Sequence, residues 1–257
     1  MMKFFCNLLA AMKGQRAVMA LLPLCLFAFL PLSAQRQTDT FRTTSGKEVK
    51  ITCIKHASIL IEYDGRYFYF DPVTGLKPET DFTAMPRANY ILITHEHPDH
   101  FDRMALTQLV SSTTVVYTNQ AVSALYRNSY VMQNGDSVSI TRDVQLKAVP
   151  AYNTTKGREQ MHPKGRDNGF ILTLDGLRIY VAGDTEDIPE MQDIKNIDIA
   201  FLPCNQPYTM TPEQLCRAAR IIRPKVLFPY HYAQTPVRPL TFMLKGDGID
   251  VRIRNYQ

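Results

Sequence analysis

The sequence predicts a fold of mixed α and β structure in which strands dominate. The 257 residues are enough for one domain with a sizeable core, and 45% of them are hydrophobic. Short apolar segments recur along the chain with turn residues between them, which is typical of strands. Segments with helical spacing are inserted in both halves. Two facing sheets with helices outside would bury both sheet surfaces.

The first 34 residues have the composition of a secretory signal. Lys13 and Arg16 precede an apolar segment that ends at Leu32 and is followed by the small residues Ser33 and Ala34. This order predicts cleavage after residue 34 and export to the periplasm or the medium. The alternative is a retained membrane anchor. It is less favoured because the apolar segment is shorter than the ~20 residues that span a bilayer, and it contains prolines.

After the signal at 1–34, the sequence predicts a flexible lead-in at 35–48 and one globular domain at 49–257. The chain has 29 basic and 24 acidic side chains. Three of the basic ones lie in the signal, so 26 basic and 24 acidic side chains remain after cleavage. This balance is too near neutral for a nucleic-acid partner, which needs clustered basic charge. The remaining cysteines are odd in number, so they form no disulfide scaffold. We expect these cysteines to be buried free thiols, with a single disulfide as the alternative. They are Cys53, Cys204 and Cys216.

The first half contains strands and two helices. Asp64-Gly65 is typical of a hairpin turn between two strands. The apolar run at 90–94 is typical of a strand that is covered on both faces. In order, the expected strands are 49–54, 58–63, 66–70, 90–94 and 114–117, and the expected helices are 101–110 and 120–127.

The second half has the same character. Asp175-Gly176 is another hairpin turn. Thr211 is a good N-cap and Pro212 suits the first helical position, so a helix is expected at 212–222. The expected strands are 137–140, 144–150, 170–174, 178–182, 197–202, 226–229 and 251–254.

Three of the six histidines lie within Thr-His-Glu-His-Pro-Asp-His at 94–100, directly after an apolar strand. Because side chains alternate along an extended backbone, His95, His97 and Asp99 would point to the same side, and His100 adds a further nitrogen. Imidazole and carboxylate donors suit zinc, and also iron or manganese. A solvated polar loop is the alternative. So many histidines at one strand end favour a metal site instead.

Three further candidate ligands lie outside this motif. Asp184 and His231 each follow an apolar strand, and Gly183 lets the backbone near Asp184 approach its neighbours closely. The alternatives are a cap or turn residue for Asp184 and a hydrogen-bonded core residue for His231. His162 lies in a polar stretch, 154–168, that would form a loop over the site.

The motif His95-x-His97-x-Asp99-His100 resembles the signature of the metallo-β-lactamase superfamily. The similarity extends over residues 49–235, and its flanks resemble a branch of bacterial metal-dependent hydrolases related to L-ascorbate-6-phosphate lactonase. These flanks are Lys55-His56-Ala57-Ser58, Phe70-Asp71-Pro72, Val149-Pro150-Ala151-Tyr152-Asn153, Gly183-Asp184-Thr185 and Pro229-Tyr230-His231-Tyr232. The resemblance implies an α+β fold, a four-layer αββα sandwich with metals at one edge between the sheets.

The resemblance also implies two metal ions, taken here as zinc, with iron or manganese as alternatives. The first ion would be held by His95, His97 and His162. The second would be held by Asp99, His100 and His231, and Asp184 would bridge the two. With these aspartates supplying the negative charge, Cys204 is interpreted as a thiol of the core or of the site lining.

Four other residues are expected near the site. Asp71 would accept a hydrogen bond from a ligand histidine or brace the motif loop. His56 would contact substrate or orient a ligand, with a plain structural role as the alternative. Asn205 and Tyr208 follow another strand and could reach the substrate.

The implied function is an exported hydrolase in which a hydroxide held by two zinc ions attacks an ester, lactone or phosphodiester. Asp99 would be the catalytic residue that orients the nucleophile and passes a proton to the leaving group. The substrate would be a small molecule or a lipid. A basic stretch favours an anionic one, with a solvated loop as the alternative; it consists of Lys156, Arg158, Lys164 and Arg166.

Two other functions stay open. One is hydrolysis of a β-lactam or another amide, and the other is non-catalytic binding by a protein that kept the fold. An iron redox protein of this fold would carry an acidic residue in place of His97, so this histidine favours hydrolysis. No stable membrane anchor is expected after signal cleavage.

Overall fold

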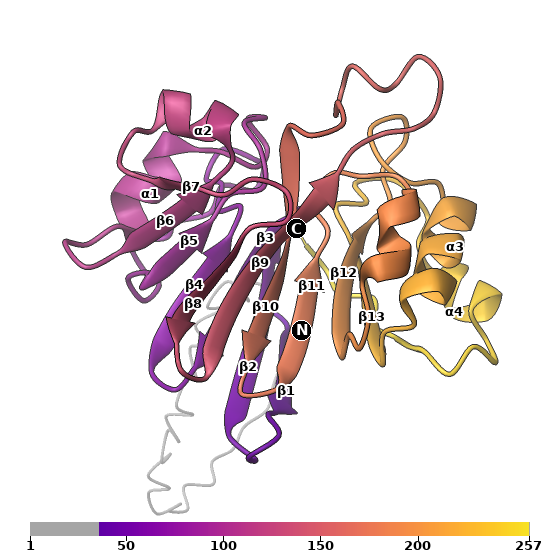
Figure 1. Cartoon of the computed structure of the whole chain (residues 1–257), viewed down its shortest axis with the longest axis horizontal. Helices are drawn as coiled ribbons and strands as arrows, with labels where there is room; N and C mark the ends of the chain where they lie inside the picture. The colour runs from indigo at the N-terminus through magenta and orange to yellow at the C-terminus, as the bar shows by residue number, and fades with distance from the viewer. Residues whose placement is uncertain (1–35, 257) are drawn as a thin grey trace, which may run out of the picture. The chain divides into compact units, whose positions relative to one another are not determined.

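A computed structural model of the chain describes residues 36–256. The predicted signal and its cleavage site lie outside the described residues. Residues 36–256 form two seven-stranded sheets with helices on their outer faces (Figure 1). The predicted α+β fold, a four-layer αββα sandwich, is therefore confirmed. Among the described residues, no helix has the length and apolar character needed to cross a membrane.

The first sheet is built entirely from the N-terminal half of the domain, with its strands in chain order. The strands are β1 (Thr38–Arg42), β2 (Glu48–Lys55), β3 (Ser58–Tyr63), β4 (Arg66–Phe70), β5 (Tyr90–Leu92), β6 (Val115–Thr118) and β7 (Tyr130–Val131). Pairing is antiparallel from β1 to β4 and parallel from β4 to β7. Helices α1 (Arg103–Leu109) and α2 (Gln120–Leu125) connect the later parallel strands.

The second sheet repeats this plan in the C-terminal half. Its strands are β8 (Ser137–Thr141), β9 (Val144–Ala151), β10 (Asp167–Leu174), β11 (Leu177–Val181), β12 (Ile199–Pro203), β13 (Val226–Tyr230) and β14 (Asp250–Val251). They are antiparallel from β8 to β11 and parallel from β11 to β14. The connections contain a short 3₁₀ helix η1 (Pro189–Asp193), α3 (Pro212–Ile222) and α4 (Leu240–Met243).

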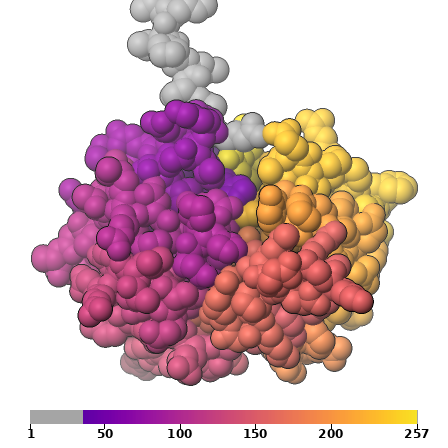
Figure 2. Space-filling view, turned by 90° about the horizontal axis from the view of Figure 1, so that it is seen from above, coloured from indigo at the N-terminus to yellow at the C-terminus, as the bar shows by residue number. Residues whose placement is uncertain are grey.

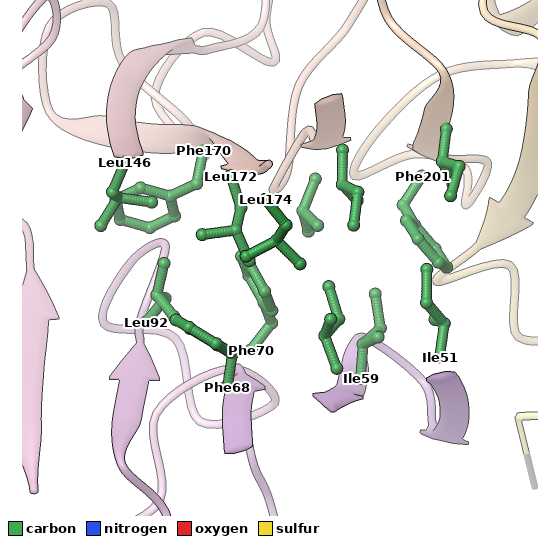
Figure 3. Close-up of a cluster of buried hydrophobic side chains, with 14 of the residues drawn as sticks. Ile51, Ile59, Phe68, Phe70, Leu92, Leu146, Phe170, Leu172, Leu174 and Phe201 are labelled. Carbon is green, nitrogen blue, oxygen red and sulfur yellow. The ribbon is translucent and has the colours of Figure 1, made fainter. Parts of the chain in front are cut away.

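The main core lies between the two sheets. Phe68 and Phe70 of β4 point toward Phe170 of β10, and all three side chains are fully buried (Figure 3). Outside the second sheet, α3 begins where the sequence predicted. The side chain of Thr211 accepts a hydrogen bond from the backbone of Gln214, and the Gln214 side chain accepts one from the backbone of Thr211. The central strands are buried on both faces, because one face of each sheet packs against the other sheet and the opposite face against the helices.

The expected flexible lead-in at 35–48 was partly wrong, because Thr38–Arg42 forms the edge strand β1. Distant residues hold this strand in place. Asp39 accepts hydrogen bonds from Arg252 (2.9 Å) and Arg254 (2.7 Å), and Phe41 packs edge-on against Phe228. The predicted last strand, 251–254, was too long, since β14 ends at Val251. The sequence also gave no sign of β7.

Candidate metal centre

The predicted ligands leave the sheets at one edge. The motif follows β5, Asp184 follows β11 and His231 follows β13, while His56 lies in the β2–β3 turn. His162 lies in the long β9–β10 loop, which stands at the top of Figure 1. Because β5, β11 and β13 run as parallel strands within their sheets, their carboxyl ends lie where ligands converge. Seen from above, the two halves of the chain meet along a seam on this face (Figure 2).

Four residues form what we call the first donor group: His95, His97, His162 and Asp184. One ligand atom from each lies within 4.8 Å of those of the others. His95 Nε2 is 3.1 Å from His97 Nδ1, and His162 Nε2 is 3.4 Å from Asp184 Oδ2. His95, His162 and Asp184 are buried, while His97 is partly exposed. All four residues are among the predicted metal ligands.

The second donor group contains His56, Asp99, His100 and His231. Asp99 Oδ2 lies 3.3 Å from His231 Nε2 and 3.1 Å from His56 Nε2. The rings of His56 and His231 are in contact, with centroids 3.8 Å apart. The sequence reasoning placed His56 beside the ligands, whereas the structure puts its ring nitrogen among the donor atoms themselves.

Asp184 lies between the two groups. Its Oδ2 is 3.4 Å from both His162 Nε2 and His231 Nε2, and its Oδ1 is 3.3 Å from His100 Nε2. Gly183 makes this position possible. It has a φ of +67°, and a Cβ there would come within 2.7 Å of the Asn168 carbonyl oxygen. The carboxylate of Asp184 therefore reaches the donors of both groups.

Neighbouring polar side chains contact the Nδ1 atoms of three histidines, on the side of each ring that faces away from the other donor atoms. His100 Nδ1 is 2.8 Å from Asp71 Oδ2, and His162 Nδ1 is 3.0 Å from Asp167 Oδ2. Thr94 Oγ1 donates to Asp71 and lies 3.0 Å from His95 Nδ1. Such contacts orient a ligating imidazole and leave its other nitrogen directed at the metal. Asp167 was missed by the sequence reasoning, because its position beside Arg166 made it look like part of a solvated, charged loop.

The inner atoms of these side chains lack hydrogen-bond partners. His100 Nε2, His231 Nε2 and Asp184 Oδ1 are all buried without one. Buried polar atoms are normally paired, so several unpaired ones that converge on one space require an explanation. Imidazole nitrogens and carboxylate oxygens are the donors that zinc and similar divalent ions prefer. The side chains present thus fit bound metal ions.

The pKa values of the histidines in this site shift in opposite directions. Burial acts to lower the pKa of His100, but the nearby carboxylates of Asp184 and Asp71 outweigh it and hold the pKa well above its usual value. Burial, followed by the positive charge of His100, lowers the pKa of His95 well below its usual value. Burial opposes ionisation of Asp184, but His231 and His100 outweigh it and keep its pKa well below the usual value. Protons and cations therefore compete for the same inner atoms.

Comparison with known families decides the identity. A family profile described as a beta-lactamase superfamily domain matches residues 50–231. The chain belongs to the metallo-β-lactamase superfamily. The recognition made from the motif is thereby confirmed at the level of the superfamily.

Relatives of this superfamily member are described as metal-dependent hydrolases. One from Carboxydothermus hydrogenoformans is 29% identical over 80% of this chain and 96% of its own length. Another, from Ligilactobacillus salivarius, is 32% identical over 73% of this chain and 87% of its own. A crystal structure from Parabacteroides distasonis, of a protein assigned as a metal-dependent hydrolase, is 51% identical. It covers 86% of this chain and 100% of its own, with a TM-score of 0.83. The chain is therefore a metal-dependent hydrolase.

Backbone strain accompanies the site of this hydrolase. His56, Asp71 and His231 have φ values of +50°, +40° and +49°, in the left-handed region that non-glycine residues rarely adopt. The His231 backbone N–H donates to the His56 carbonyl at 3.1 Å, which ties two of these residues together. Such conformations cost free energy and persist where the surroundings enforce them, most often at functional sites.

Within residues 36–256, the structure gives no contact of the remaining predicted residues, Asn205, Tyr208 and Cys204, with either donor group. Asn205 accepts backbone hydrogen bonds from Tyr208 and Thr209, and the Tyr208 carbonyl accepts one from Asn153. The Tyr208 side chain is 49% exposed, so its contact with substrate stays a prediction. Cys204 is free and fully buried, and burial raises the pKa of its thiol to about 12. This thiol belongs to the core of the second half.

The basic stretch is mostly engaged in the folded loop. Lys164 pairs with Glu190 at 2.7 Å, and Arg166 pairs with Asp167 at 2.7 Å and with Glu96 at 3.2 Å. Arg166 therefore supports the aspartate that holds His162. Preference for an anionic substrate stays a prediction.

Proposed function

We propose that this chain is an exported hydrolase that uses two zinc ions to cleave an ester, lactone or phosphodiester. The observation that carries the proposal is the position of Asp184 between two donor groups. A single carboxylate in this position suits two ions that share it. The histidine-rich donor set favours zinc, with iron and manganese as the alternatives.

Two such ions would polarise the carbonyl or phosphoryl oxygen and lower the pKa of a water toward about 7. The protein supplies the rest. His95, His162 and Asp184 are buried, and contacts of the Nδ1 atoms with Thr94 and Asp167 orient the rings of His95 and His162. Asp99 has a side chain that is 33% exposed, so it faces the side from which substrate arrives.

Asp99 is the residue we assign to proton transfer. Burial opposes its ionisation, but the close contacts of its carboxylate with His231 (3.3 Å) and His56 (3.1 Å) outweigh this and keep its pKa below the usual value. In ester cleavage, the water oxygen bonds to the carbonyl carbon and the bond to the alkoxy oxygen breaks. One water proton passes by way of Asp99 to the departing alkoxide, and the acid product loses the other to solvent.

Elemental analysis of the purified protein, with a screen of lactones, carboxylic esters, phosphodiesters and β-lactams, tests this function. We expect about two zinc ions per chain and turnover that a chelator abolishes. Two ions without any turnover would favour the non-catalytic binding protein, and selective β-lactam cleavage would favour the amide hydrolase. Absence of metal after reconstitution would refute the mechanism.

Export is the second part of the proposal, and it rests on the sequence at 1–34. Mass spectrometry of protein secreted by a bacterial host should find a chain that begins near Gln35. An intact N-terminus in the membrane fraction would instead support a retained anchor.

A further inference from the structure

A cavity of about 570 Å³ lies directly beside Asp99. This volume is in the range of ~300–1,000 Å³ that is usual for small-molecule sites. Its walls come from three parts of the chain: the loop after β4, the loop between the motif and α1, and the end of α2. The apolar wall residues are Leu76, Pro98, Phe101 and Leu125.

The wall is held in shape by polar contacts behind it. The Lys55 ammonium donates to the Leu76 carbonyl, which fixes the β4 loop. Arg103 donates to the Leu125 carbonyl, which joins the start of α1 to the end of α2. Leu125 is 46% exposed, so its side chain is open to contact with a bound ligand.

The charges in the wall do not suit an anionic occupant. Besides Asp99, the cavity is lined by Asp102 and Arg103, which have opposite signs. Asp102 is already bonded, because it accepts from the Thr74 backbone at 2.7 Å and caps α1 through the Met104 N–H at 2.8 Å. With no surplus of positive charge and four apolar side chains, the cavity favours a neutral aliphatic group.

We propose that this cavity binds the aliphatic acyl chain of a carboxylic ester whose scissile carbonyl lies at Asp99. The inference rests on the proposed hydrolytic function and narrows its substrate from an ester, lactone or phosphodiester to a carboxylic ester with an aliphatic acyl chain. The acyl chain would leave water along Leu76, Phe101 and Leu125 while the carbonyl faces the donor groups. Burial of each methylene then contributes to binding in proportion to its apolar area.

The test compares p-nitrophenyl acetate, butanoate and octanoate with the metal-reconstituted full chain. We expect kcat/KM to rise by about fourfold for each methylene that the cavity encloses. In Leu125→Glu the octanoate-to-acetate ratio of kcat/KM should fall by at least about tenfold, because a carboxylate replaces an apolar contact. Leu76→Glu, in the loop after β4, should lower the same ratio.

Phe242→Glu is the matched control. Phe242 is 79% exposed on α4, outside this cavity, so the substitution adds the same charge at another exposed apolar residue. The control should keep the wild-type ratio. A ratio that stays the same in Leu125→Glu and Leu76→Glu, or a flat series from acetate to octanoate, would overturn the proposal.

A binding measurement separates this inference from the proposed function. Calorimetric titration with sodium octanoate and sodium acetate should show tighter binding of octanoate to the wild type and loss of that preference in Leu125→Glu. If no ester is cleaved but this preference is found, the cavity proposal holds and the hydrolytic mechanism fails. If esters are cleaved without any chain-length preference in rate or binding, the mechanism holds and the cavity proposal fails.

Discussion

The two donor groups differ in how they face the solvent. In the first group, the side chains of His95, His162 and Asp184 are at most 3% exposed. In the second group, Asp99 is 33% and His56 is 15% exposed, and the apolar cavity opens beside Asp99.

The difference between the groups is one of degree, because His97 of the first group is also partly exposed and His100 and His231 of the second are buried. With two partly exposed members beside the cavity, the second group is the one that we expect to meet the substrate. Asp184 is a member of the first group but also lies 3.4 Å from His231 Nε2 and 3.3 Å from His100 Nε2 of the second. Substitutions can therefore test how far the two groups act separately.

Removal of the shared carboxylate should have the largest effect. Asp184→Ala is expected to lower metal content at both groups and reduce kcat/KM by about a thousandfold or more, since the ions supply several kcal/mol. Metal analysis and chelator-sensitive turnover measure this. Asp187→Ala is the control, because Asp187 pairs with Arg217 outside both donor groups. Full zinc with full activity in Asp184→Ala would rule out a bridging role.

Removal of one histidine from either group should have a smaller effect on metal content. His162→Ala and His231→Ala are each expected to lose about one metal equivalent, because each residue belongs to only one group. Titration of the metal-free variants with zinc would count the remaining sites. If either variant keeps two ions at wild-type affinity, that histidine is not a ligand.

The supporting carboxylates should show smaller effects still. Asp167→Asn and Asp71→Asn are expected to weaken metal affinity by about 10- to 100-fold, each at its own group, since they orient His162 and His100. Competition with a chelator of known affinity measures this. If either variant lowered the metal affinity of both donor groups equally, the two groups would be coupled more tightly than their separate hydrogen bonds suggest.

The smallest effect concerns the C-terminal segment behind the second group. His56 N–H donates to the Tyr256 carbonyl, and Asp39 pairs with Arg254 in the same segment. Asp39→Asn should lower the free energy of unfolding by about 1–2 kcal/mol at pH 7. It should also weaken metal binding at the second group more than at the first. Zinc affinity equal to wild type at both groups would show that the segment does not support the site.

The effect of Asp39 should depend on pH. Burial opposes its ionisation, but Arg254 and Arg252 outweigh this and lower the pKa. A lowered pKa stabilises the folded state above the unfolded pKa of about 3.9, and this stabilisation disappears as pH falls through the folded value. The difference between wild type and Asp39→Asn in urea unfolding should therefore be constant above about pH 5 and shrink below pH 4. A difference that grows in acid would contradict this assignment.

Local sequence signals predicted most of the fold and the centre of the site. The hairpins around Asp64-Gly65 and Asp175-Gly176, and α3 with its Thr211 cap, follow from neighbouring residues alone. The motif after β5 needs only a strand end and alternating donors. For these features, the determining contacts lie within a few residues along the chain.

Most of the features that were missed depend on contacts that the sequence pattern does not show, either between distant residues or within a folded loop. The edge strand β1 is stabilised by Arg252 and Arg254, more than two hundred positions away, so its polar sequence gave no sign of order. Asp167 acquires its role only when the β9–β10 loop folds back and brings His162 to it. The ring of His56 reaches the second donor group only because the β2–β3 turn lies against His231.

Each sheet is a continuous stretch of the chain, and each donor group draws on both stretches. His95 and His97 follow β5 of the first sheet, whereas His162 and Asp184 come from the second, and His231 crosses the same seam to meet Asp99 and His100. An ion bound at either place would add a further link between two halves that polar contacts already join at this edge, among them the His231 N–H to the His56 carbonyl and the Arg166–Glu96 ion pair. The concentration of available metal would then affect the free energy of unfolding of the domain as well as its activity.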